Sequence, residues 1–223
     1  MGSVMLGRHR LLVVAAAGWV AAILLAVPVA LADSTLPGEA AIVRAVQEAP
    51  GWLEPAARGA RAITTTEAVL LAGAALAAIL FAGRLRFAAA ALAIGLVVLP
   101  IAQGGLKEVV DRPRPTEAQV DVRDGWTSPS FPSGHVMSGT LLFTYLAVSP
   151  AFRSRLSTRA AATIRGVAIA VIVLNALANV YMGVHWPTDV VAGLLLGGGL
   201  GLAVVWLEGM FQHRRPVASG EHR

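Results

Sequence analysis

The stretch NALANVYMGVHWPTDVVAG, residues 175–193, places strongly polar side chains at the end of an apolar run. Two asparagines, Asn175 and Asn179, are followed by His185 and Asp189, which stand four residues apart. Residues at this spacing lie on one face of a helix, so Asp189 can accept a hydrogen bond from one imidazole nitrogen of His185. That bond would fix the tautomer and leave the other ring nitrogen as a nucleophile. A His–Asp pair that only caps a helix explains the same spacing, and the stretch alone does not decide between the two.

The composition of the whole chain is that of a membrane protein. Of its 223 residues, 56% are hydrophobic and 14% are charged, whereas soluble domains carry roughly 25% charged residues. The chain contains no cysteine, which excludes a disulfide framework, a thiolate nucleophile and a cysteine metal site. The net charge of +5 does not indicate nucleic-acid binding, because the arginines stand at the ends of apolar segments, where membrane topology accounts for them.

Six apolar segments qualify as membrane-spanning helices, which need about 20 apolar residues each. Their approximate bounds are 11–32, 65–83, 87–108, 134–149, 162–182 and 188–209. Pro187 suits the first turn of the last helix. Three glycines follow on one face of that helix and would allow neighbouring helices to approach closely, namely Gly193, Gly197 and Gly201. We therefore predict an all-α integral membrane protein with six transmembrane helices in a single domain, residues 1–223.

The distribution of basic residues predicts which side of the membrane each loop faces. With a cytoplasmic N-terminus, the inner regions hold eleven basic residues and the outer regions seven, four of which crowd one loop. The positive-inside rule then places both termini in the cytoplasm, including a tail over residues 210–223, and the loops after the first, third and fifth helices outside. Seventeen of the 18 basic residues are arginine, which with the many alanines and glycines indicates a GC-rich bacterial genome. We expect a multi-pass protein of the bacterial plasma membrane.

The first apolar segment has a second interpretation. Arg8, Arg10, an apolar stretch and the tripeptide ALA before Asp33 resemble a signal peptide with its cleavage site. The apolar stretch over residues 11–32 is longer than the hydrophobic region of a typical signal peptide. We therefore favour a retained helix over cleavage of residues 1–32.

Residues 33–62 form a polar outer segment. Four apolar residues recur in it at helical spacing, namely Ile42, Ala45, Val46 and Ala49. This pattern predicts an amphipathic helix that lies on the membrane surface. An ordinary structured loop is the alternative.

The stretch KEVVDRPRP, residues 107–115, gathers basic side chains at a helix end. Lys107 ends an apolar segment, and Arg112 and Arg114 each precede a proline. The prolines stop the helix and bias the residues before them toward extended conformations. Three cations this close repel one another unless they share an anion, for which phosphate is the obvious candidate. A lipid-headgroup anchor explains the cluster equally well when it is taken alone.

The stretch SPSFPSGH, residues 128–135, leads into the fourth apolar segment. Ser133 and Gly134 stand where that helix begins, so its positive end and its free N–H groups point outward as an anion site. His135 lies in the first turn beside them. In isolation, a serine N-cap with an incidental histidine accounts for the same residues.

Together, the three clusters resemble the signature motifs of a known family. Lys107, six residues and then Arg114-Pro115 form the first motif, PSGH at 132–135 the second, and YMGVHWPTD at 181–189 the third. In order, spacing and topology they are similar to the motifs of the type 2 phosphatidic acid phosphatase superfamily. The six-helix layout extends the resemblance over most of the chain and implies that family's helical bundle core.

The resemblance implies a role for each matching residue. His185 is expected to attack phosphorus and form a phosphohistidine, and Asp189 to orient and polarise it. His135 is expected to donate a proton to the leaving oxygen and then to act as base for the hydrolytic water. The phosphoryl oxygens would be bound by Lys107 and Arg114, with Ser133 and the Gly134 amide assisting. No cofactor and no metal is expected, since the sequence shows no compact Asp/Glu cluster to hold a metal.

The third motif departs from the family pattern, which reads Ser-Arg, five residues, His, three residues, Asp. Here Ala178 and Asn179 replace the serine and the arginine. A hydrogen bond to a charged group contributes roughly 1.5–3 kcal/mol, so losing it would slow turnover about 10- to 100-fold unless another group replaces it. Asn179 can donate from its amide, supported by Asn175 one turn away, but it adds no charge. Arg112 and Arg123 are the predicted substitutes for the missing cation.

The predicted function is a membrane lipid phosphatase with its site on the extracytoplasmic side. The family includes phosphatases for polyprenyl diphosphates, phosphatidylglycerophosphate and phosphatidic acid. We place undecaprenyl diphosphate first as substrate and the two glycerophospholipid phosphates second. Two alternatives stay open: a lipid phosphotransferase of the same superfamily, and a lipid-phosphate-binding protein whose catalysis is weakened at Asn179. Vanadate-dependent haloperoxidases share the pocket motifs but are soluble, and the six apolar segments argue against them. Membrane lipids are expected partners and nucleic acid is not.

Overall fold

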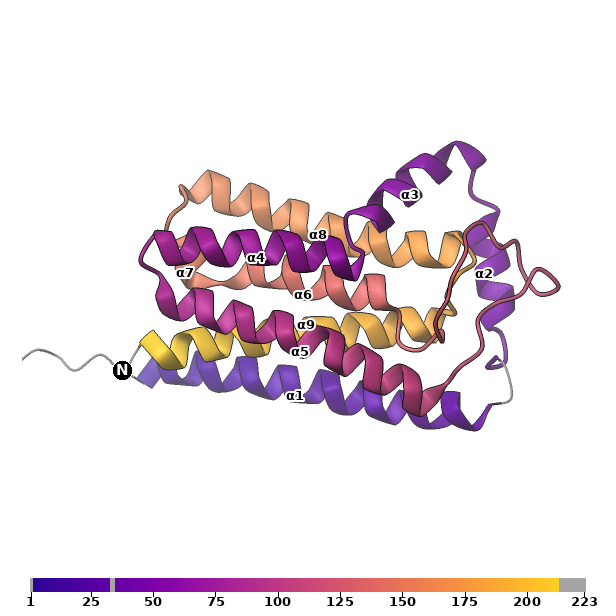
Figure 1. Ribbon diagram of the computed structural model, residues 1–223, viewed down its shortest axis with the longest axis horizontal. Helices are drawn as coiled ribbons and strands as arrows, with labels where there is room; N and C mark the ends of the chain where they lie inside the picture. Colours follow the sequence, from indigo (N-terminus) through magenta and orange to yellow (C-terminus); the bar gives the residue numbers. More distant parts are fainter. Residues whose placement is uncertain (1, 33–34, 213–223) are drawn as a thin grey trace, which may run out of the picture.

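Each of the six predicted apolar segments forms a helix in the computed structural model, which describes residues 2–32 and 35–212 (Figure 1). Its elements are α1 (Gly2–Leu31), α2 (Glu39–Gln47), the short 3-10 helix η1 (Gly51–Leu53), α3 (Glu54–Ala62), α4 (Thr66–Ala82), α5 (Arg86–Val110), α6 (Gly134–Val148), α7 (Pro150–Arg153), α8 (Thr158–Tyr181) and α9 (Pro187–Gln212). Within the described ranges there is no β-strand, so the all-α prediction is confirmed. The predicted tail over residues 210–223 lies outside these ranges from residue 213 onward.

Helix length and apolar composition support fewer membrane spans than the six predicted, and do not settle their number. By length and apolar composition, four helical segments of the described chain can cross a membrane, namely His9–Leu31, Arg86–Val110, Thr158–Tyr181 and Pro187–Met210. The segments Gly51–Ala62 and Thr66–Ala82 are bent by 52° at their junction and add a fifth span if they are counted as one. α6 has 15 residues, about 22 Å at 1.5 Å per residue, which is shorter than a hydrocarbon core of about 30 Å. The protein is thus a multi-pass helical membrane protein, and its sixth span stays a prediction.

α6 lies at the centre of the bundle and packs against α4, α8 and α9 (Figure 1). The predicted glycine stripe of α9 faces it. A β-carbon added to Gly193 would lie 2.9 Å from the carbonyl oxygen of Ser133, and one added to Gly201 would lie 2.9 Å from that of Leu141. At Gly197 an added carbon would meet the backbone of Met137. The glycines therefore allow α9 and α6 to approach almost backbone to backbone, as the spacing predicted.

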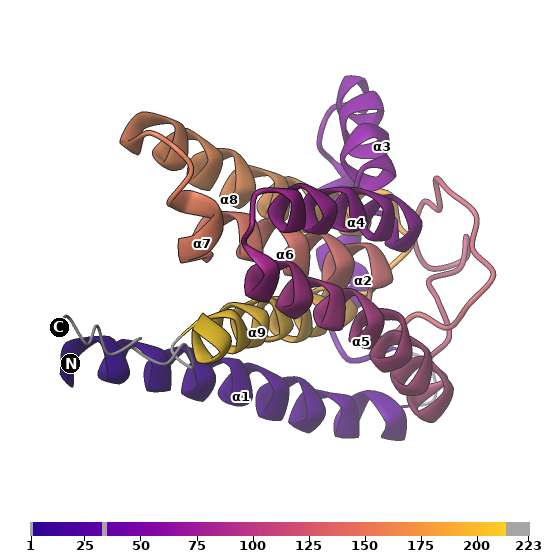
Figure 2. The same cartoon turned by 60° about the vertical axis from the view of Figure 1, so that its left-hand side comes forward.

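α1 packs along α9 (Figure 2). Three small residues seven positions apart are buried on one face of α1, namely Ala15, Ala22 and Val29. On the other side of the contact, a β-carbon added to Gly199 would lie 2.5 Å from the Trp19 ring. A helix packed in this way favours retention of residues 1–32 over a cleaved signal peptide, and retention stays a prediction.

The outer segment forms α2 and α3, which gather with the loop of residues 111–133 at one end of the bundle (Figures 1 and 2). The predicted surface helix is therefore present as α2, but its buried side differs from the prediction. Val43 is fully buried in a cluster with Trp186 and Val190, whereas Ile42 is 51% exposed. α2 thus packs on the protein, against the ends of α8 and α9. Val46 and Ala49 of the predicted face take part in this packing, whereas Ile42 and Ala45 are exposed.

Candidate active site

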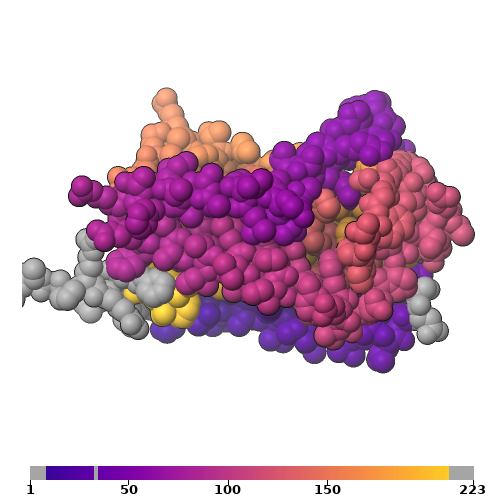
Figure 3. Space-filling view, in the orientation of Figure 1, coloured from indigo at the N-terminus to yellow at the C-terminus, as the bar shows by residue number. Residues whose placement is uncertain are grey.

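A cavity of about 300 Å³ lies at the end of the bundle where α3 and the loop of residues 111–133 meet. Figure 3 shows the surface hollowed there, between α3–α4 and this loop. Five of the predicted site residues line the cavity: Lys107, Arg114, Gly134, His135 and His185. The structure therefore brings together the end of α5, the loop, the start of α6 and the turn between α8 and α9.

His185 lies in the turn between α8 and α9, and its neighbours fix which ring nitrogen carries the proton. Nε2 lies 3.1 Å from Nη1 of Arg114. A guanidinium can only donate, so Nε2 is the acceptor and the ring proton is on Nδ1. Nδ1 lies 3.5 Å from Oδ2 of Asp189. Burial and then the positive charge of Arg114 lower the pKa of His185 to about 3, so the ring is neutral near pH 7, as a nucleophile must be.

Asp189 is held in place by donors other than the imidazole. Its Oδ2 accepts from the Ser130 hydroxyl at 2.5 Å and from the backbone N–H of Trp186 at 2.8 Å. Its Oδ1 accepts from Nη1 of Arg112 at 2.6 Å. The carboxylate is completely buried, and its position behind His185 is fixed from three directions. Asp189 does not line the cavity, as expected for a group that acts through the histidine.

Arg112 is placed away from the cavity, contrary to its predicted use as a phosphate cation. It is 2% exposed, and its guanidinium bonds Asp189, the Thr188 hydroxyl at 2.7 Å and the Glu39 carboxylate of α2. Glu39 also accepts from the Thr188 backbone N–H at 3.2 Å. The charge of Arg112 is therefore taken up by two buried carboxylates, which sequence spacing could not reveal because Glu39 comes from the outer segment.

Arg123, the other predicted substitute, does not line the cavity either. Its Nε donates to Asp121 at 2.7 Å, and its guanidinium stacks over the Tyr181 ring, with 4.2 Å from Cζ to the ring centroid. Its backbone N–H donates to the carbonyl oxygen of Met182 at 3.0 Å. These contacts fasten the loop to the end of α8.

Lys107 and Arg114 both reach the cavity, held by carbonyl oxygens of the loop. The Lys107 ammonium donates to the carbonyl of Pro129. Arg114 donates from Nε to the carbonyl of Ser128 at 2.8 Å and from Nη1 to that of Val184 at 2.7 Å. α5 ends at Val110, and the following residues up to 116 are irregular, as the prolines predicted. Neither cation has a carboxylate partner among the described residues, so both charges are directed at the cavity.

The start of α6 supplies the second motif. Ser133 is the N-cap of this helix, and its backbone N–H donates to the carbonyl of Asp189 at 3.1 Å. The Ser133 hydroxyl is buried without a hydrogen-bond partner, and it does not line the cavity. Gly134 and His135 do line it, and the Asn175 amide donates to the carbonyl of His135 at 2.9 Å. The helix start is therefore locked to both α8 and α9.

Asn179 lies behind the cavity wall, and an arginine from another element reaches it. Asn179 is completely buried, and its Oδ1 accepts from Nη1 of Arg61 at 2.9 Å. Its amide nitrogen donates to the side chain and the carbonyl of Asn175, whose Oδ1 accepts from the Thr64 hydroxyl at 2.9 Å. Both asparagines are thus bonded to the junction of α3 and α4, and Arg61 lines the cavity.

Sequence reasoning missed Arg61, Glu39 and Ser130. All three are within 7% exposure, and the two charged ones come from the outer segment. A signal was present for Arg61, which immediately precedes an apolar segment and is therefore close to membrane depth. No signal in the sequence pairs Glu39 with Arg112, because 73 residues separate them.

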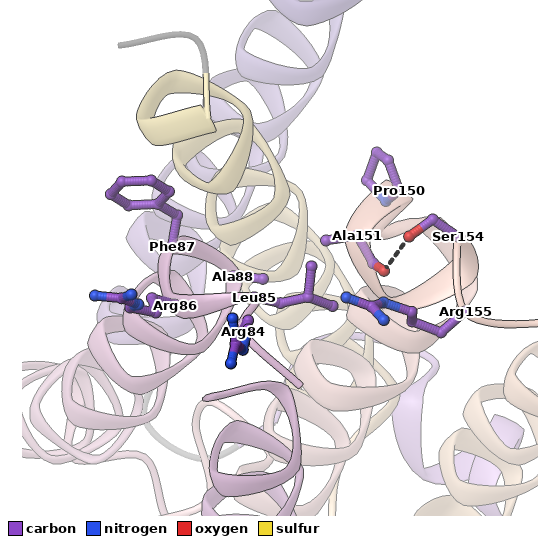
Figure 4. A pocket seen from close by; sticks show the side chains of 9 residues that line it. All are labelled: Arg84, Leu85, Arg86, Phe87, Ala88, Pro150, Ala151, Ser154 and Arg155. Atoms are coloured by element: carbon purple, nitrogen blue, oxygen red, sulfur yellow. Dashed lines mark hydrogen bonds between the residues drawn. The ribbon is translucent and has the colours of Figure 1, made fainter. Parts of the chain in front are cut away.

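Another cavity, of about 740 Å³, lies at the opposite end of the bundle, where α5 begins (Figure 4). Three arginines line it, Arg84, Arg86 and Arg155, together with apolar residues and one serine. Arg155 is bound to the carbonyl of Gly83 at 2.9 Å. The lining offers positive charge but no imidazole or carboxylate, so it lacks the nucleophile and acid that the smaller cavity holds. Among the described residues, no three His, Asp or Glu side chains are grouped so that they could hold a metal ion.

Comparisons with known proteins identify the fold and the family of the chain. A 83-residue part of the chain is 39% identical to an undecaprenyl-diphosphatase of Sulfolobus acidocaldarius, a match that covers 37% of this chain and 35% of that relative. The crystal structure of a transmembrane PAP2-type phosphatidylglycerolphosphate phosphatase from Bacillus subtilis superposes with a TM-score of 0.70 over 89% of this chain and 98% of that one, at 23% sequence identity. The fold is therefore that of a PAP2 membrane phosphatase. The sequence profile of the PAP2 superfamily matches residues 84–212, more than half of the chain, and the chain belongs to that superfamily.

Proposed function

We propose that this protein is a metal-independent membrane lipid phosphatase that works through a phosphohistidine. One observation carries the proposal: His185, whose Nε2 lies beside Arg114, lines a cavity together with His135, Lys107 and Arg114. A neutral imidazole next to fixed cations suits attack on a phosphoryl group, whose charge lies on its equatorial oxygens in the transition state. Membership of the PAP2 superfamily supports the same chemistry.

The reaction has two steps. In the first, Nε2 of His185 forms a bond to the terminal phosphorus while the bond from that phosphorus to the leaving oxygen breaks, and protonated His135 gives its proton to that oxygen. The leaving oxygen is the lipid oxygen of a phosphomonoester or the bridging oxygen of a diphosphate. The dianionic phosphate favours the protonated form of His135, because an opposite charge stabilises it. In the second, His135 takes a proton from water, the water oxygen bonds to phosphorus and the P–N bond breaks. Phosphate leaves and both histidines return to their starting states.

Asp189 and the cations have separate tasks. The imidazole becomes positive when Nε2 attacks, and the Asp189 carboxylate behind Nδ1 stabilises that charge. Lys107 and Arg114 bind the phosphoryl oxygens, with the Gly134 amide at the positive end of α6 assisting. Ser133 assists only if its hydroxyl, which is buried without a partner, turns to the cavity on substrate binding.

The proposed substrate is a lipid phosphate whose headgroup enters the cavity from the membrane surface. A polyprenyl diphosphate such as undecaprenyl diphosphate comes first, supported by the activity named for the Sulfolobus relative. Phosphatidylglycerophosphate or phosphatidic acid comes second, supported by the name of the Bacillus structure. We further propose a single domain in a bacterial plasma membrane, with both termini cytoplasmic and the cavity facing outward, on the strength of the arginine distribution.

The test is phosphate release from purified protein. Full-length protein in lipid nanodiscs is offered each lipid in turn, with EDTA present throughout. We expect release from at least one lipid, loss of release in His185→Ala, and unchanged release in His9→Ala, a matched histidine variant on α1 far from the cavity. Absence of release from every lipid would refute the proposed function. Release that EDTA abolishes would refute the metal-independent mechanism.

A further inference from the structure

Position 179 is where the superfamily motif would place a phosphate-binding arginine, and in this chain the residue there is Asn179. The carboxamide is too short and uncharged to do the work of a guanidinium. Instead, Nη1 of Arg61 lies 2.9 Å from its Oδ1. Arg61 belongs to α3, and its guanidinium is hydrogen-bonded to the side chain at position 179.

Arg61 faces the reacting groups. It lines the same cavity as His135, His185, Lys107 and Arg114. Its side chain is 8% exposed, so its charge is little screened by bulk water. An arginine that only anchored α3 to α8 would not need to reach a cavity that contains two histidines and two other cations.

The second partner of Arg61 leaves room for a substrate. Nη2 forms an ion pair of 3.1 Å with Oδ2 of Asp124, whose side chain is 37% exposed. A pair with a partly exposed carboxylate is weak. A phosphate dianion in the cavity, which can bind the planar fork in a bidentate manner, is a stronger partner. Asp124 belongs to the loop that covers the cavity through its neighbours Gly125 and Trp126.

We propose that Arg61 is a phosphate-binding residue of this enzyme and replaces the arginine that the third motif lacks, with Asn179 as the positioning residue that holds it. This inference rests on the proposed function. It assigns the missing charge to α3, which precedes the segment matched by the superfamily profile, residues 84–212. The ligand that Arg61 recognises is the phosphoryl group of the lipid.

Asn179 is suited to this arrangement for a physical reason. Its Oδ1 accepts from Arg61 while its amide nitrogen donates to Asn175, so the carboxamide cannot rotate without losing both bonds. A second guanidinium at position 179 would face that of Arg61 at close range and repel it. We therefore expect the site to hold one arginine, at position 61 or at position 179, but not both.

The test exchanges the two positions. Arg61→Ala should lower kcat/KM by about 10- to 100-fold, the loss expected for one charge-assisted hydrogen bond to phosphate. Adding Asn179→Arg to Arg61→Ala should restore most of that loss, because the charge returns from α8. Asn179→Arg alone should not raise kcat/KM. Arg58→Ala is the matched control: Arg58 lies on α3, its side chain is 49% exposed, and it does not line the cavity. Its guanidinium bonds Glu54 and, at the surface, the Arg123 carbonyl, so activity should be unchanged.

The outcomes separate a binding role from a structural one. If Arg61→Ala retains activity within about threefold, or if it loses activity and Asn179→Arg fails to restore it, Arg61 is not the substitute cation. A folding defect would appear as a lower melting temperature that Asn179→Arg does not correct.

Binding of inorganic phosphate, measured by calorimetry, tests the inference apart from turnover. Arg61→Ala should weaken it about tenfold or more, and Arg58→Ala should not. This result stands even if the wild-type protein releases no phosphate from any lipid, so failure of the proposed function and failure of this inference remain distinguishable. Equal phosphate affinity in wild type and Arg61→Ala would overturn the inference.

Discussion

Replacing Arg112 with methionine should destabilise the protein strongly, because two buried carboxylates share its charge. Arg112 is 2% exposed, Glu39 4% and Asp189 0%. Methionine fills a similar volume but leaves both carboxylates without their cation. Removal of one partner from a buried ion pair costs about 3–5 kcal/mol. For a chain of this size each kcal/mol lowers the melting temperature by about 2–4 °C, so we expect Arg112→Met to melt about 6–20 °C below the wild type.

The assay is thermal unfolding of the purified protein in detergent, followed by circular dichroism. Arg58→Met is the control, because its ion pair with Glu54 is largely exposed; exposed pairs contribute about 0–1 kcal/mol, so its melting temperature should fall by less than about 4 °C. Adding Glu39→Gln to Arg112→Met removes one unpaired charge and should recover part of the loss. If Arg112→Met melts within the range of the control, the buried network does not stabilise the site as argued.

Three further predictions concern the cavity and the helix contact behind it. Asp124→Asn removes the carboxylate that pairs with Arg61 and competes with phosphate for it, so it should lower KM, measured by phosphate release; an unchanged or higher KM would contradict this. The pKa of His185, which burial and Arg114 lower to about 3, is about 6.5 in the unfolded chain. Between these two pH values the unfolded chain binds a proton that the folded chain does not, so the free energy of unfolding falls as the pH drops below 6.5, by up to about 1.4 kcal/mol per pH unit. In His185→Gln, the melting temperature should therefore fall less steeply between about pH 6.5 and 5 than in the wild type. An equally steep fall would count against the neutral imidazole. Gly197→Val places methyl groups against the Met137 backbone and should cost about 1–3 kcal/mol or more of stability, whereas an unchanged melting temperature would show that α6 and α9 can separate without loss.

Local sequence patterns predicted much of the fold. Apolar runs marked all six long helices, and the glycine stripe of α9 marked its closest neighbour contact. The apolar runs did not show whether each helix is long enough to cross the membrane: α6 is apolar but has only 15 residues. For α2, helical spacing predicted the element, but Val43 rather than Ile42 faces the core. Helical periodicity indicates that one side of a helix is apolar, but only the tertiary packing shows which residues of that side are buried.

The candidate site was predictable where its residues belong to spaced motifs. His135 and His185 stand in such motifs, and the structure places both in one cavity. The missing cation was assigned to Arg112 and Arg123 because they lie in the loop nearest the other basic residues, whereas the cation that reaches Asn179 is 118 residues away in sequence, at Arg61. Proximity along the chain cannot show which arginines are already neutralised by carboxylates, and long-range partners decide that.

The central claim is that His185 carries the phosphoryl group, and acid-sensitive labelling tests it most directly. Purified enzyme is mixed with a lipid labelled in its terminal phosphate, quenched in alkali within the first turnover, and analysed for protein-bound phosphate. We predict a label that is stable in alkali and released by acid, that maps to the peptide containing His185, and that is absent from His185→Ala. An enzyme that releases phosphate without ever carrying such a label, or a label that persists in His185→Ala, would contradict the account.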